Sequence, residues 1–231
     1  MPIALLGFKP SVTFLVRKTG QSPTKSCAEG LGILLQLSFA RVATLMTQSL
    51  AYKAPFGPNG HRPVDSATCE RLLSTALSRG GDFADLFFEY RASSGFSFDE
   101  GILKAASRGV SMGLGVRVLK GDASGFAYTE DLSWEAMKHA AETAAQIASG
   151  GGGIEQVVLK ARPHVQRYDL PAVSIDQPGL EKRRLLERAS AAAHAHDAHI
   201  IKAEASFAEE VREILIATSD GVMMHDVQPL F

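Results

Sequence analysis

Cysteine is scarce in this sequence. The 231 residues include only Cys27 and Cys69, which lie far apart in segments of different character. Two such cysteines argue against a disulfide framework and against a cysteine-rich zinc site, and they fit a reducing, cytoplasmic location. Cys69 falls on the apolar side of a predicted helix, so we expect a buried structural thiol there.

The sequence also lacks an excess of charge of either sign. Its 24 basic and 25 acidic residues give a formal net charge of -1 at pH 7, and no basic stretch is interleaved with aromatic residues. Such a chain has no long-range field that selects nucleic acid or an anionic membrane. We therefore predict neither as a partner.

No apolar run is long enough to cross a membrane. The longest apolar stretch of the first 45 residues is interrupted by Gln36 and Arg41, whereas a membrane-spanning helix needs roughly 20 apolar residues. A chain of this length can bury a core without cross-links, and one principal domain is expected.

Residues 1–63 differ in composition from the rest. They are basic, contain Glu29 as their only acidic residue, and end in a linker rich in Pro and Gly from Ala54 to Pro63. Two interpretations stay open: an organellar transit peptide, or an untidy 5′ extension with Met46 as the true start. In either case the principal domain is expected over 64–231.

The most informative stretch runs from Gly80 to Asp131, where apolar residues recur at every second position. Turn-forming residues interrupt this pattern at 99–101 and 120–122, so we predict consecutive short antiparallel strands with one apolar face. The residues expected on that face are Ala84, Leu86, Phe88, Tyr90, Phe96, Phe98, Leu114, Val116, Val118, Phe126 and Tyr128.

Helical spacing appears in three other segments. We predict helices from 65 to the Gly80–Gly81 pair, from about 133 to 149, and from 180 to 196, each with an apolar stripe. Asp65 or Ser66 is expected to cap the first of these helices, and Asp131 or Ser133 the second. The expected inward residues are Cys69, Leu72, Leu73, Ala76 and Leu77, then Met137, Ala140, Ala141, Ala144 and Ile147, and finally Leu185, Leu186, Ala189 and Ala193, with Lys182, Arg183 and Glu187 pointing outward.

The last third of the chain is predicted to return to strands. Ile201, Ala203, Ala205 and Phe207 form one arm of an expected hairpin, Glu209–Glu210 its turn, and Ile214, Ile216 and Thr218 its second apolar face. After another turn at 219–221, a strand begins at Val222 and the chain ends within it.

Several runs in these strands occur in a particular order and spacing. They are GDFADLFFE at 81–89, DEG at 99–101, GV at 109–110, GLGVR at 113–117, GD at 121–122, GFAYT at 125–129, ATSDG at 217–221 and DVQPL at 226–230. Together they resemble the amino-terminal domain of the TldD/TldE (PmbA) zinc metallopeptidases, with TldD the most similar. The resemblance implies proteolysis of peptides or unfolded segments, a TldD–TldE type of assembly, and a link to gyrase modulation.

That family resemblance also implies a zinc site made of a His-Glu-x-x-x-His helix and a later cysteine. None of the seven histidines here is followed by Glu, and without three ligands no metal-bound water is activated. We therefore predict no catalytic, metal or cofactor-binding residue in this chain, which we expect to stop before the motif and to be inactive alone. Zinc is expected in a full-length parent.

One histidine cluster offers a different interpretation. His194, His196 and His199, with Glu204 nearby, have side chains that bind divalent ions. A strand pattern from Ile200 onward predicts instead that the helix ends near residue 197. We favour a solvated helix end, where imidazoles meet the last carbonyl groups.

Three further features carry weaker functional signals. Gly109, Gly113 and Gly115 lie in strand-like sequence rather than between a strand and a helix, so strong twist, a bulge or close approach of another backbone is preferred to a phosphate loop. Such an approach suits a peptide-binding groove. Arg117 is expected to be solvated, and Trp134 to be a packing anchor.

The sequence therefore predicts an α+β fold, a largely antiparallel sheet with helices packed on one face. By resemblance, we expect the substrate- and subunit-facing part of a TldD-type peptidase, with a peptide or unfolded-protein substrate and a TldE- or TldD-type subunit as partners. The alternative is a free-standing binding or regulatory module that docks on a complete TldD or TldE subunit.

Overall fold

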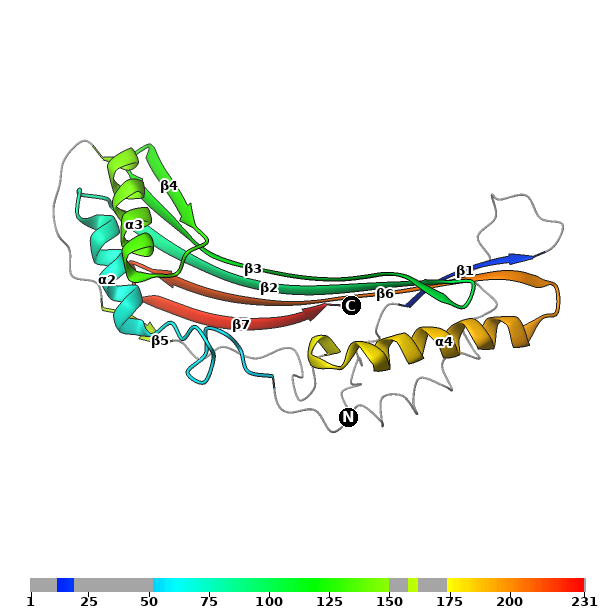
Figure 1. Cartoon of the computed structure of the whole chain (residues 1–231). Helices are drawn as coiled ribbons and strands as arrows, with labels where there is room; N and C mark the ends of the chain where they lie inside the picture. The colour runs from blue at the N-terminus through cyan, green and yellow to red at the C-terminus, as the bar shows by residue number, and fades with distance from the viewer. Residues whose placement is uncertain (1–11, 19–51, 150–157, 162–173, 231) are drawn as a thin grey trace, which may run out of the picture.

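The computed structural model describes residues 12–18, 52–149, 158–161 and 174–230. These residues form one curved sheet with three helices on one of its faces (Figure 1). The strands follow the order β4-β3-β2-β6-β7-β5, and β1 also pairs with β6. All of these pairs are antiparallel except β5 with β7. The predicted α+β fold with helices on one face is confirmed.

The described elements have the following bounds. The strands are β1 Val12–Lys18, β2 Phe83–Asp99, β3 Ile102–Lys120, β4 Ala123–Thr129, β5 Lys160–Ala161, β6 Ile200–Thr218 and β7 Val222–Leu230. The helices are α2 Ser66–Leu77, α3 Trp134–Ala148 and α4 Gly179–His196, with a short 3-10 turn at Ser174–Asp176. No helix in this part of the chain is long and apolar enough to cross a membrane.

The strands β2 and β3 form a single long hairpin rather than the short strands predicted. They have 17 and 19 residues, and they pair from Phe83 opposite Leu119 to Asp99 opposite Ile102. The predicted turn joins them, because Glu100 and Gly101 both adopt positive φ angles of 50° and 77° and so let the chain reverse within two residues. No such turn interrupts either strand, so the pairing continues.

The strand β6 overturns the hairpin expected around Glu209 and Glu210. It runs without interruption through both glutamates and pairs with β2 from Thr218 opposite Asp85 to Glu204 opposite Asp99. The reason is that Glu209 and Glu210 each find a cation, one on either side of the sheet, as described below. Because both carboxylates have a cationic partner, they can lie within a strand rather than in a solvent-exposed turn.

A continuous β6 also changes which residues face the helices. With no reversal at 209, the alternation set by Phe207 continues through Val211, Glu213, Leu215 and Ala217, which are all buried. The residues expected on this face, Ile214, Ile216 and Thr218, lie on the opposite side. A strand has a period of two, so one misplaced turn inverts every side chain that follows it.

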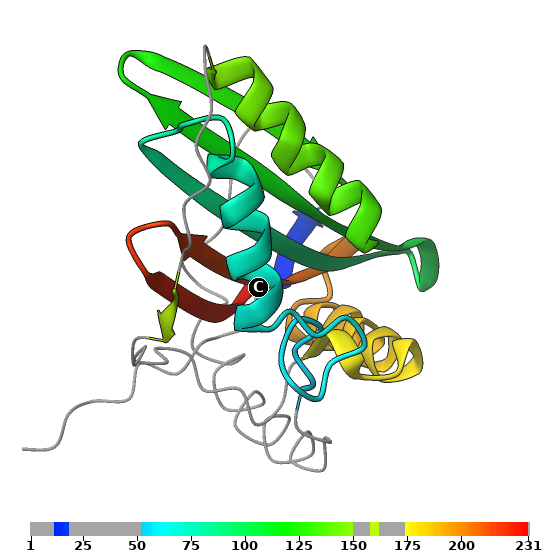
Figure 2. The ribbon, with the colours of Figure 1, turned by 90° about the vertical axis from the view of Figure 1, so that its left-hand side faces the viewer.

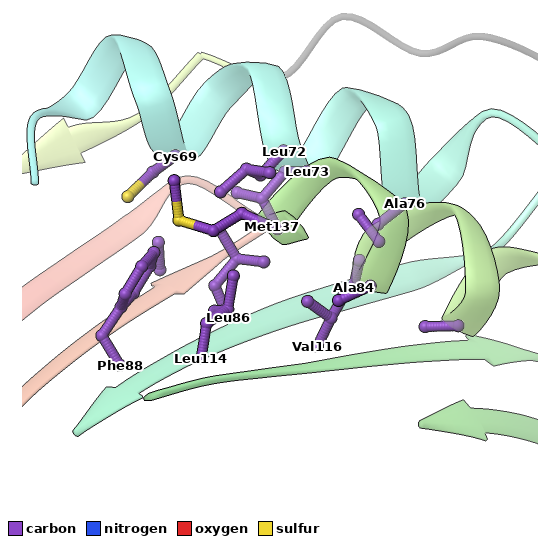
Figure 3. Close-up of a cluster of buried hydrophobic side chains, with 14 of the residues drawn as sticks. Cys69, Leu72, Leu73, Ala76, Ala84, Leu86, Phe88, Leu114, Val116 and Met137 are labelled. Carbon is purple, nitrogen blue, oxygen red and sulfur yellow. The ribbon is translucent and has the colours of Figure 1, made fainter. Parts of the chain in front are cut away.

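At one end of the sheet, α2 and α3 pack across the strands (Figure 2). Cys69, Leu72 and Leu73 of α2 meet Leu86 and Phe88 in a continuous apolar core (Figure 3). Asp65 caps α2 by accepting a hydrogen bond from the Thr68 amide at 2.8 Å, and Ser133 caps α3. These two helices and their caps agree with the prediction, except that Ile147 is 58% exposed.

Toward the other end, α4 covers the same sheet face with a smaller apolar cluster. Leu185 and Leu186 contact Phe98, Ala205 and Phe207. Ala193 is also buried, as predicted, whereas Ala189 is only partly so.

Lys182 lies on the buried side of α4, contrary to its predicted outward position. Its side chain is only 5% exposed and its amine pairs with the carboxylate of Glu209, to which Ser94 also donates a hydrogen bond. A buried charge is tolerated when it has both an ionic partner and hydrogen bonds. Helical spacing alone does not reveal such a partner on a distant strand.

Between these two ends, the segment before α2 covers the middle of the sheet. Phe56 is buried in the core, and its amide donates a 3.0 Å hydrogen bond to Glu213, which also contacts His225 Nε2 at 2.6 Å. The segment predicted as a linker therefore contributes to the core. The division of the chain at residue 63 stays a prediction.

Candidate functional site

The sheet face opposite the helices, here called the outer face, carries a series of ion pairs. Four of them join neighbouring strands, namely Asp85 with Arg117, Glu89 with Arg212, Arg91 with Glu210, and Asp99 with Lys202, and Lys202 also pairs with Glu204 on its own strand. Exposed pairs of this kind contribute about 0 to 1 kcal/mol each. Their regular spacing along β2 and β6 shows a surface adapted to water.

One part of the outer face departs from this pattern. A hollow of about 290 Å³ lies where β3 meets β4, and we call it the β4 hollow. Its lining residues are Phe87, Glu89, Ser111, Met112, Gly113, Leu114, Gly115, Phe126, Tyr128, Thr129 and Glu130. Phe126 and Tyr128 are 59% and 72% exposed, so two large aromatic side chains stand in solvent.

Two glycines of β3 create the floor of the β4 hollow. A Cβ atom added to Gly115 would lie 3.2 Å from the Phe126 ring, and one added to Gly113 would lie 2.9 Å from the Thr129 carbonyl oxygen. Both glycines therefore permit a close approach of β4, which is one of the three roles predicted for them. They sit inside a strand, which is not the position of a phosphate-binding loop.

The aromatic residues of β4 correct a prediction. Phe126 and Tyr128 were expected on the same apolar face as Val116, but they point to the outer face instead. The residues of β4 on the helix side are Gly125 and Ala127, and Gly125 is buried directly under α3. Because α3 approaches closely, only small residues fit there, and the large ones face away.

This arrangement is chemically suited to an extended peptide. Aromatic rings offer apolar surface at low conformational cost, and β4 is the last strand of the sheet on this side. An extended segment can add to such an edge by main-chain hydrogen bonds, while pockets for its alternate side chains give sequence specificity. The carboxylate of Glu130 lies on the rim of the hollow, whereas that of Glu89 is paired with Arg212.

The histidine cluster is dispersed in the structure. The helix α4 ends at His196, as the strand pattern predicted, so His199 does not share its face. His194 Nδ1 lies 3.3 Å from the Ile200 carbonyl oxygen, and His199 Nδ1 lies 2.9 Å from Asp197. Across residues 12–18, 52–149, 158–161 and 174–230, no three His, Cys, Asp or Glu side chains are arranged to hold a metal ion.

The remaining singled-out residues lie where the sequence placed them. Arg117 is exposed and donates a 2.8 Å hydrogen bond from Nε to Asp85. Trp134 packs against the core beside α2, with the Arg71 guanidinium 3.8 Å from its ring centre. Cys69 is fully buried, and burial raises the pKa of its thiol to about 12.

Two family models match most of the described region. A model described as PmbA/TldA metallopeptidase domain 1 matches residues 84–148, and one described as the PmbA/TldA metallopeptidase central domain matches residues 174–231. The chain belongs to the PmbA/TldD metallopeptidase family. Strands β2 to β4 of the first match and β6 to β7 of the second form one shared sheet, so these two regions of the family fold are joined through β2 and β6.

Similar proteins of the TldD/PmbA family share limited sequence with this chain. A metalloprotease TldD homolog of Haemophilus influenzae is 30% identical over 171 residues, which is 72% of this chain and 35% of that protein. A metalloprotease TldD homolog of Buchnera aphidicola subsp. Acyrthosiphon pisum is 26% identical over 159 residues, which is 68% of this chain and 32% of that protein. The chain thus spans about a third of the length of the curated relatives it matches.

Two solved structures share the fold of this chain. A putative modulator of a DNA gyrase from Thermotoga maritima matches with a TM-score of 0.56 at 15% identity, over 71% of this chain and 37% of that one. TldE from Thermococcus kodakarensis matches with a TM-score of 0.50 at 18% identity, over 70% and 37%. At these identities the likeness shows the architecture alone.

Proposed function

We propose that this chain is the substrate- and subunit-facing, amino-terminal part of a TldD-type metallopeptidase that acts on peptides or unfolded segments. The observation that supports this most directly is the β4 hollow, an exposed aromatic surface beside a strand edge in a family of peptidases. In this proposal the hollow holds an extended apolar segment of the substrate.

Catalysis is assigned to a longer parent protein. No histidine of this sequence begins a His-Glu-x-x-x-His motif, and zinc bound by such a motif would supply the activated water for peptide hydrolysis. The residues of this chain would bind and position the peptide without touching the scissile bond. We further propose a cytoplasmic location and assembly with a TldE- or TldD-type subunit.

The peptide-binding role can be tested with the purified chain and a fluorescently labelled, unstructured apolar peptide. We expect saturable binding by fluorescence anisotropy and at least a tenfold weaker affinity in the double variant F126A/Y128A. Ile201→Ala is the matched control, because Ile201 is also an apolar side chain that is 59% exposed on a strand. Equal affinity in the double variant and the wild type would contradict the proposal.

The assignment of catalysis is tested in the same preparation. We expect no cleavage of the peptide with or without added zinc. Cleavage that depends on zinc and stops with a chelator would place the active site within this chain.

A further inference from the structure

A second hollow lies on the helix side of the molecule, at the amino-terminal ends of α2 and α3. It encloses about 390 Å³, and we call it the Trp134 pocket. The side chains that matter for its chemistry are His61 and Arg62 from the loop before α2, Arg71 from α2, and Val64, Leu132 and Trp134. No feature of the peptide-binding proposal uses this pocket.

The stacking of Arg71 on Trp134 fixes a guanidinium group in the wall of the pocket. Its carbon lies 3.8 Å from the centre of the indole ring, which is a close cation–π contact. A cation–π contact does not use a hydrogen-bond acceptor, so it leaves N–H groups of the guanidinium available for a ligand. That planar fork matches the two oxygens of a carboxylate.

The nearby carboxylates are already engaged in capping the helices. Asp65 accepts from the Thr68 amide at 2.8 Å, and Asp131 accepts from the Ser133 amide at 2.8 Å and from the Ser133 hydroxyl at 3.0 Å. These hydrogen bonds lower the pKa of both carboxyl groups, and the charges of Arg71 and Arg62 lower the pKa of Asp65 and Asp131 to a smaller extent.

Arg62 and Arg71 remain able to bind an anion. Among the described residues, neither Arg62 nor Arg71 forms an ion pair with a carboxylate within 4 Å. Two guanidinium groups and the His61 imidazole therefore give the pocket a set of donors that faces an incoming anion.

The rest of the pocket wall is apolar. Val64, Leu132 and Trp134 are partly buried and pack against the main core, and Met137 behind them is buried. An inorganic anion would leave this apolar wall without a partner. A carboxylate joined to an apolar side chain would satisfy both halves of the pocket.

We propose that the Trp134 pocket binds the free carboxylate of a peptide terminus whose last side chain is apolar. Arg62 and Arg71 hold the carboxylate, and Val64 and Leu132 contact the side chain. The pocket lies on the sheet face opposite the β4 hollow, so it recognises a peptide end independently of the proposed binding of an extended segment.

The single tryptophan of the sequence reports on this pocket directly. The probes are N-acetyl-leucine, its carboxamide N-acetyl-leucinamide, and inorganic phosphate, each titrated into the full chain while Trp134 emission is recorded. We expect a saturable change with N-acetyl-leucine and at least a tenfold weaker response to the amide. Phosphate should neither mimic nor displace N-acetyl-leucine.

Variants separate the pocket from general charge effects. Arg62→Gln should weaken N-acetyl-leucine binding about tenfold or more. Arg71→Lys should also weaken this binding, although the charge is retained. Because Arg71→Lys alters the environment of Trp134, its binding is measured by calorimetry. Arg79→Gln is the matched control, since Arg79 is exposed just beyond the other end of α2. F126A/Y128A should bind N-acetyl-leucine normally.

Three outcomes would overturn the proposal. They are an equal response to the acid and the amide, unchanged affinity in both Arg62→Gln and Arg71→Lys, and displacement of N-acetyl-leucine by phosphate at similar concentration. The last outcome would indicate a simple anion site. Because F126A/Y128A separates the two hollows, failure here leaves the test of the β4 hollow unaffected.

Discussion

The two ends of the sheet bury their helices in different ways. Where α2 and α3 pack side by side, the interior is a continuous cluster of apolar residues such as Leu72, Leu73 and Phe88. Where α4 packs alone, a small apolar cluster adjoins the buried pair of Lys182 and Glu209. The same strands thus run through an interior held by apolar burial and one that depends on a matched pair of charges.

The largest expected effect is at the charged end. Lys182→Ala leaves the carboxylate of Glu209 buried without its cation, so we expect a loss of about 3–5 kcal/mol in the free energy of unfolding. Urea denaturation measures it. Arg183→Ala is the control on the same helix, because its pair with Glu187 is exposed and should contribute less than about 1 kcal/mol.

A double variant sharpens this prediction. Replacing the pair with apolar residues in K182M/E209L removes both charges together, and we expect a stability near that of the wild type. A double variant as unstable as Lys182→Ala would show that side-chain packing, rather than an unpaired buried charge, determines the stability of the α4 end of the sheet.

At the apolar end, Leu73→Ala should cost about 2–5 kcal/mol, because it removes buried methyl groups and leaves a cavity. The thiol of Cys69 provides a local readout, since its pKa of about 12 keeps it protonated and unreactive at pH 8. In a Cys27→Ser background, we expect Leu73→Ala to speed the reaction of Cys69 with a thiol reagent. An equal increase in Lys182→Ala would mean that the two ends unfold as one unit.

The smallest effect is expected at the start of α2. Asp65→Ala should cost about 1 kcal/mol through the lost cap. Hydrogen bonds from Thr68 lower the pKa of Asp65, so its contribution is present above the unfolded-state pKa of about 4 and is lost as the pH falls through the folded-state value. The stability difference between wild type and variant should therefore shrink in acid. A difference that stays constant down to pH 2 would contradict this.

Local patterns predicted the elements that depend on near neighbours. The spacing of Cys69, Leu72 and Leu73 and the capping residue Asp65 lie within one segment, so the sequence alone located α2. The alternation from Ala84 to Tyr90 and the turn at Glu100–Gly101 located the β2–β3 hairpin for the same reason.

The errors arose where a residue depends on a distant partner. The predicted turn at Glu209 and Glu210 is wrong, because Lys182 and Arg91 pair with these two carboxylates from opposite faces of the sheet and let the strand continue. The aromatic side of the β4 hollow was also not predicted, since the register of β4 on β3 is what brings Phe126 and Tyr128 beside Gly115 on the outer face.

The pairing of β2 with β6 has a consequence for how the chain acquires its structure. Residues 83–148 contain a hairpin, its extra strand and α3, all of which can form from local contacts during synthesis. The burial of Phe98 in β2, however, needs Ala205 and Phe207, which are made more than one hundred residues later. Contacts of such sequence separation are slow to form, so a nascent chain would expose this apolar stretch until β6 arrives.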